Sequence, residues 1–130
     1  MKFCDFLEKQ DGLVMSGGKD EDSISEAENI LRAPFADEYK SYLRKYGAVS
    51  YDGHELTGLI RSKRLNVVDC TIKQREENDC ILPDMYVVEN LGIDGIVVLQ
   101  ASNGKVYMLY SYDNEIREVA NSLLEYLQKG

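Results

Sequence analysis

Two apolar runs near residues 96–110 dominate the pattern of hydrophobic and polar positions along the chain. Residues 96–99 and 106–110 are dense in β-branched and aromatic side chains, which fit the half-buried surface of a strand. Between them lies Ser102-Asn103-Gly104, and Asn and Gly tolerate the positive φ angles that a tight hairpin turn needs. Because both runs are nearly continuous, they predict a central hairpin with helices over one face and partial cover on the other.

The segment that begins near residue 23 has helical periodicity and an evident start signal. Ser23 and Ser25 are candidate N-caps, because a serine oxygen can accept from the free N–H groups of a first turn. Residues 19–22, Lys-Asp-Glu-Asp, are then expected to form an exposed acidic loop, and Pro34 breaks the helix. The expected buried face consists of Ile24, Ala27, Ile30 and Leu31.

An aromatic stripe predicts the next helix, over residues 36–46, with Gly47 as its C-cap. A shorter pattern of the same kind predicts a helix over residues 2–10. The stripe consists of Phe35, Tyr39, Tyr42, Leu43 and Tyr46.

The remaining elements set the fold class. Short strands are predicted at 48–52 and 54–59, joined by a turn at Asp52-Gly53, and a further strand at 86–90. A helix with a thin apolar face is predicted over 65–75, and a strongly amphipathic helix over 116–127, capped by Asp113-Asn114 and closed by Gly130. This order predicts one α+β domain over residues 1–130, with a mainly antiparallel central sheet packed by N-terminal helices and a C-terminal helix.

Charge narrows the classes of partner. The 130 residues include 15 cations and 23 anions, for a net charge of −8, and no basic tract. Nucleic acids and anionic membranes both require clustered Lys and Arg, so neither is expected as a partner. An acidic surface suits a basic protein, although it also serves solubility.

Location follows from what the sequence lacks. There is no apolar run long enough to span a membrane and no signal-peptide pattern at the start, so the cytoplasm is the expected location. Three cysteines without a CxxC pair predict reduced thiols rather than a disulfide framework.

Motifs for chemistry are sparse. The glycines of residues 12–20 are misplaced for a phosphate-binding loop, and Asp20 stands where a magnesium-binding hydroxyl is required. His54 is the only histidine, and no cysteine or carboxylate cluster at ligand spacing accompanies it. We therefore expect no catalytic residue, no cofactor and no metal.

Several pieces, taken in order, resemble the SUKH superfamily of cell-wall-assembly-regulator-like domains. The resemblance spans roughly residues 24–127, although this chain has none of the tryptophans that many members carry. The matching pieces are Ile24-x-x-Ala27-Glu28-x-x-Leu31, then Ala33-Pro34 with the tyrosine-rich helix that ends at Tyr46-Gly47, then Leu82-Pro83-Asp84-x-Tyr86-Val87-Val88-Glu89 followed by Asp94-Gly95, and finally Gly104-Lys105-Val106-Tyr107.

The resemblance implies an α+β fold and a role common among bacterial members, that of an immunity protein that binds and neutralises a cognate toxin, often a nuclease. Other members are regulatory interaction modules without a toxin, and that alternative stays open. A toxin that acts on nucleic acid is basic, so an acidic partner would speed association.

Candidate contact residues fall in two groups, with Asp20, Glu21 and Asp22 as an alternative cluster. The first group surrounds the predicted turn at Asp52, and the second lies in the polar segment 75–79, which is expected to be an exposed loop. The two groups are Tyr51, Asp52, His54 and Glu55, and Glu76, Glu77 and Asp79.

Overall fold

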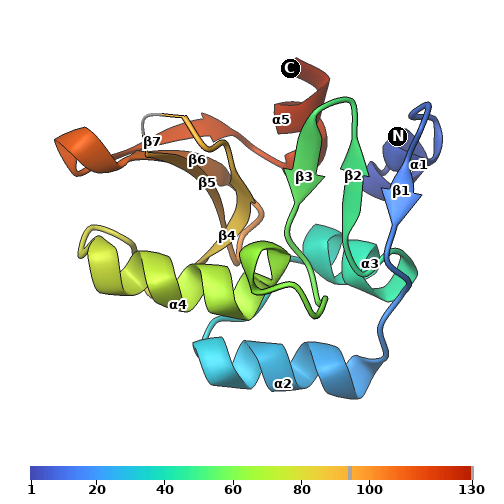
Figure 1. The fold of residues 1–130 in the computed structure, drawn as a ribbon, viewed down its shortest axis with the longest axis horizontal. Coiled ribbons are helices and arrows are strands. Elements are labelled where there is room, and N and C mark those ends of the chain that lie inside the picture. The colour runs from blue at the N-terminus through green and yellow to red at the C-terminus, as the bar shows by residue number, and fades with distance from the viewer. Residues whose placement is uncertain (94, 130) are drawn as a thin grey trace.

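The computed structural model describes residues 1–93 and 95–129 and shows one curved antiparallel sheet with helices against it (Figure 1). The helices are α1 (Phe3–Glu8), α2 (Glu21–Leu31), α3 (Asp37–Lys45), α4 (Val67–Glu77) and α5 (Leu123–Lys129), with 3-10 turns η1 (Lys63–Leu65) and η2 (Ser111–Asp113). The strands are β1 (Val14–Met15), β2 (Val49–Tyr51), β3 (His54–Leu56), β4 (Met85–Asn90), β5 (Ile96–Ala101), β6 (Val106–Tyr110) and β7 (Glu115–Ala120).

The strands lie in the sheet in their sequence order, β1 to β7, and each neighbouring pair is antiparallel. This confirms the predicted α+β class and the predicted hairpin of β5 and β6. Asp94 and Gly130 lie outside the described residues, so the Asp94-Gly95 piece of the resemblance and the helix stop expected at Gly130 are not described.

Helices on the two sides of the sheet produce two clusters of buried side chains. α4 lies beneath the curved part of the sheet formed by β4 to β7 (Figure 1), and that cluster includes Val87, Val97 and Leu99. Adjacent residues of β4 and β5, such as Val88 and Val98, join the larger cluster with α1, α3 and α5. Successive side chains of a strand point to opposite faces of the sheet. A strand that is buried on both faces therefore needs apolar residues at successive positions, as the continuous runs of β4 and β5 provide.

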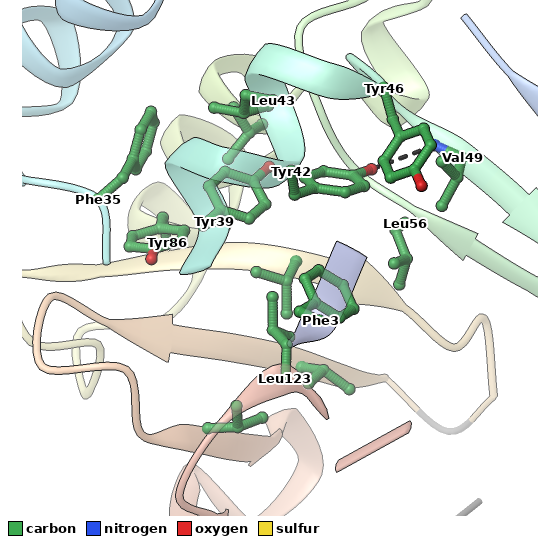
Figure 2. Packing of buried hydrophobic residues seen from close by; sticks show 14 of the residues in the cluster. Phe3, Phe35, Tyr39, Tyr42, Leu43, Tyr46, Val49, Leu56, Tyr86 and Leu123 are labelled. Carbon is green, nitrogen blue, oxygen red and sulfur yellow. Dashed lines mark hydrogen bonds between the residues drawn. The ribbon is translucent and has the colours of Figure 1, made fainter. Parts of the chain in front are cut away.

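The predicted aromatic stripe is confirmed and forms the centre of the larger cluster (Figure 2). The hydroxyl of Tyr42 donates to the carbonyl of Thr57 (2.7 Å) and accepts from the N–H of Val49 (3.1 Å). One buried side chain thereby ties α3 to β2 and to the residue that follows β3, and its own polar atom is satisfied.

The predicted start of α2 is wrong. Asp20, not a serine, is the N-cap, and its carboxylate accepts from the N–H of Ser23 (2.9 Å). Glu21 and Asp22 belong to the first turn, where negative charge is favourable beside the free N–H groups. The second half of the expected acidic loop is therefore helix, and Ile30, expected to be buried, is 53% exposed.

The helix predicted over 116–127 is wrong in its first half, which is strand β7. The pairing with β6 shifts between Val106 and Tyr107, which leaves Val119 as an extra residue of a β-bulge. The bulge turns both Val119 and Ala120 toward the larger cluster, while Ile116 packs against the other. Apolar residues at 116, 119 and 120 thus imitate helical spacing within a strand.

The second half is α5, as predicted, but its cap differs. The hydroxyl of Ser122 accepts from the N–H of Glu125 (3.0 Å), which is the role expected of Asp113-Asn114. The carboxylate of Glu38 on α3 accepts from the N–H groups of Leu123 and Leu124 at 2.8 and 3.1 Å. A side chain distant in sequence therefore fixes where this helix begins.

Candidate functional site

The turn between β2 and β3 projects one predicted contact residue into solvent. Asp52 and Gly53 have φ angles of 45° and 83°, and two successive positive φ angles are typical of the tightest hairpin turns. Asp52 is exposed and forms no ion pair within the described residues. The turn that the sequence predicted here is confirmed, and it presents a single carboxylate at its tip.

Beneath this turn a buried carboxylate holds the hairpin to the rest of the fold. Glu89 on β4 is 2% exposed. One of its oxygens lies 2.9 Å from Nδ1 of His54, and the other accepts from the hydroxyl of Tyr126 on α5 (2.7 Å). A carboxylate removed from water is tolerated only when its oxygens are hydrogen-bonded, and here both are. These bonds join β3, β4 and α5 at one point.

Tyr51 lies against the same group but does not bond to it. Its side chain is only 6% exposed, and its ring lies 5.3 Å from the ring of His54. Its hydroxyl is buried and has no hydrogen-bond partner among the described residues. Burial raises the pKa of Tyr51 to about 12, and the negative charges of Glu89 and Asp52 contribute. Tyr51 therefore packs inside the fold against His54 and is not available as a surface contact.

Glu55 faces outward on β3, but its charge is already compensated. Arg64 donates two parallel hydrogen bonds to its carboxylate, at 2.8 and 3.0 Å. These bonds hold the pKa of Glu55 below its ordinary value. Of the four hairpin candidates, only Asp52 therefore carries an exposed negative charge without a cation beside it.

The second group of candidates lies at the C-terminal end of α4, well apart from the hairpin turn (Figure 1). The prediction of a loop over 75–79 is wrong, because α4 runs to Glu77 and Asn78 is buried, its amide donating to the side-chain oxygen of Gln74 (2.9 Å). Glu76, Glu77 and Asp79 are exposed, as expected, and none forms an ion pair within the ranges 1–93 and 95–129.

The loop after α4 adds an apolar residue beside these carboxylates. Arg75 holds this loop against the helix by donating to the carbonyl of Pro83 (2.9 Å), while its other nitrogen donates to the carbonyl of Leu31 (2.8 Å). Leu82, in the same loop, is 56% exposed. We call Glu76, Glu77, Asp79 and Leu82 the acidic end of α4.

The alternative cluster at Asp20 serves the helix instead. Asp20 caps α2, and Glu21 forms an ion pair with Arg44 on α3. Hydrogen bonds from Ser23 and from Arg44 lower the pKa of these two carboxyls respectively. Two of the three charges are therefore occupied in holding α2.

The described part of the chain offers neither a metal-binding cluster nor a membrane-spanning helix. No set of three or more His, Cys, Asp or Glu side chains there could hold a metal ion. No helix among those residues has the length and apolar character that crossing a membrane requires.

Two residues of the buried group were missed by sequence reasoning. Glu89 follows two valines within a strand, and an isolated carboxylate in such an apolar run is a signal of a buried, partnered charge. Tyr126 has no comparable signal, because its role depends on where α5 packs.

Comparison with known families gives a match over nearly the whole chain. The family model SUKH_5, described as SMI1-KNR4 cell-wall, matches residues 4–129, which is nearly the whole chain. No curated protein matches the sequence.

Proposed function

Because the chain belongs to the SMI1-KNR4 cell-wall family, we propose that it is an immunity protein, which binds a cognate toxin protein and blocks its activity. The family match over residues 4–129 is the observation that carries this proposal. The net charge of −8 supports a basic partner, as expected for a toxin that acts on nucleic acid. The proposal requires no catalytic group on this chain, only a surface that fits the toxin.

The acidic end of α4 is the best-suited contact surface. Its three carboxylates, Glu76, Glu77 and Asp79, carry negative charge without a compensating cation in the described structure. They also stand at a helix C-terminus, where the helix dipole is already negative and carboxylates are unfavourable. Negative charge placed where it costs stability indicates a use outside the fold, and Leu82 in the loop that follows adds an exposed apolar side chain.

The hairpin is a second contact, with a smaller electrostatic part. Asp52 offers one uncompensated charge, and the bonds of Glu89 to His54 and Tyr126 keep the turn in a fixed position. A surface that is already rigid loses less conformational entropy when a partner binds. Glu55 would contribute mainly through its pair with Arg64.

Co-expression with the protein encoded beside this chain tests the proposal. We expect the neighbouring protein to stop bacterial growth alone, and this chain to restore growth and to co-purify with it. The affinity should fall steeply with added salt, because exposed charges are screened beyond a Debye length of about 8 Å at physiological ionic strength. The absence of both growth rescue and a complex would contradict the proposal. A complex with a neighbouring protein that does not stop growth would favour the regulatory alternative.

A further inference from the structure

A hollow of about 390 Å³ lies between η1, α4 and β4. Its rim carries Lys63, Arg64 and Lys73, with Asp69 as its one carboxylate. Its interior is lined by Gln74, Val87 and Asn90, among others. The volume is within the range of about 300–1,000 Å³ that small-molecule sites occupy.

The charge of this region is opposite to that of the chain. Residues 61–75 contain five cations and one anion, although the net charge of the whole sequence is −8. Such a local concentration of positive charge attracts anions against the field of the rest of the protein.

Two of the rim cations are available to a ligand. The planar fork of Arg64 is already engaged by both oxygens of Glu55. Lys63 and Lys73 are exposed and form no ion pair with any residue in the described ranges. The free charges at this hollow are therefore ammonium groups.

A side-chain amide in the wall of the hollow offers a hydrogen-bond donor to a ligand. Gln74 lines the hollow and is only 9% exposed. Its side-chain oxygen accepts from Asn78 (2.9 Å), whereas its Nε2 donates to no atom of the described residues. Because this nitrogen is not among the enclosed polar atoms of the described residues, it is accessible and can donate to an anion in the hollow.

We propose that this hollow binds the phosphate group of a small organic molecule. Lysines bind phosphate well as point charges, and one phosphate group brings about two negative charges to the two free ammonium groups, whereas the bidentate fork of Arg64, which would suit a carboxylate or a phosphate, is occupied. The hollow is also much larger than an inorganic ion requires, since a water molecule takes about 30 Å³ of liquid. Val87 and the stem of Lys73 offer apolar surface to the organic part.

Titration with adenosine monophosphate, followed by amide NMR of the whole chain, tests this. We expect saturable shifts confined to the backbone amides around residues 63–74 and to the Nε2 group of Gln74. The double substitution Lys63→Gln/Lys73→Gln should weaken binding about ten-fold, whereas Lys9→Gln, which changes an exposed lysine just after α1, should leave it unchanged.

Parallel titrations identify the chemistry of the ligand. Inorganic phosphate and adenosine should each bind more weakly than adenosine monophosphate, and a dicarboxylate such as succinate more weakly still. The proposal is overturned if no saturable shift occurs, if Lys9→Gln weakens binding as much as the double substitution, or if succinate or a glutamate-rich peptide binds better than the nucleotide.

Discussion

The β2–β3 hairpin and the acidic end of α4 both carry acidic side chains, but these carboxylates differ in whether they have partners within the fold. At the hairpin, Glu55 is paired with Arg64, and Glu89 beneath it is buried between His54 and Tyr126. At the end of α4, three exposed carboxylates lie close together without such partners in the described part of the chain. The hairpin uses its charges to hold the fold, whereas the end of α4 leaves its charges to the solvent or to a partner.

The largest expected effect is at Glu89. Glu89→Ala should lower the free energy of unfolding by about 2–4 kcal/mol, because it leaves the half-buried hydroxyl of Tyr126 and the ring of His54 without their acceptor. Urea unfolding followed by circular dichroism measures the loss. Glu118→Ala, which removes an exposed carboxylate on β7, serves as the control and should have little effect. A loss below about 1 kcal/mol for Glu89→Ala would show that the buried group does not anchor the hairpin.

Two tyrosines beside Glu89 provide a matched pair. Tyr126→Phe should cost about 1–2 kcal/mol, since it removes a hydrogen bond to a carboxylate. Tyr51→Phe should cost nothing or stabilise slightly, because the hydroxyl that it removes has no partner among the described residues. Thermal and urea unfolding of both variants measure the difference, and equal losses would contradict the assignment of partners.

At the end of α4 the expected sign is opposite. Glu76→Lys/Glu77→Lys should raise the free energy of unfolding by about 0.3–1 kcal/mol at low salt, because cations are favourable at a helix C-terminus. The same double variant should bind the toxin less well. Stability that falls instead would mean that these carboxylates serve the fold, and the argument for this surface would fail.

The smallest effect concerns pH at Glu55. Its folded-state pKa is lowered by Arg64, so the pair stabilises the fold above the ordinary pKa of 4.5 and loses that contribution as the pH falls through the folded-state value. The difference in stability between the wild type and Glu55→Gln should therefore be small at pH 7 and vanish in acid. A difference that grows as the pH falls would contradict the pairing.

Sequence reasoning succeeded where a local pattern fixes the structure. The aromatic stripe of α3, the turn at Asp52-Gly53 and the β5–β6 hairpin each follow from spacing or turn chemistry over a few residues. It failed where distant contacts decide. The bulge at Val119 makes a strand look helical, and Glu38 helps to set where α5 begins.

The candidate site was predicted only in part for the same reason. The sequence indicates that Glu55 and Glu77 are acidic, but only the fold shows that Arg64 lies beside the first. Likewise, Glu89 and Tyr126 are 37 positions apart, and no local pattern connects them. Counting charges in a sequence therefore overstates the charge that a partner can use.

The most direct test of the account compares charge reversal in the two regions by calorimetric titration with the neighbouring toxin. We predict that Glu76→Lys/Glu77→Lys/Asp79→Lys weakens binding at least about a hundred-fold and removes most of its salt dependence. Asp52→Lys should weaken binding less, about ten-fold. Full affinity in the triple variant, with its fold intact by circular dichroism, would contradict the claim that the acidic end of α4 binds the toxin.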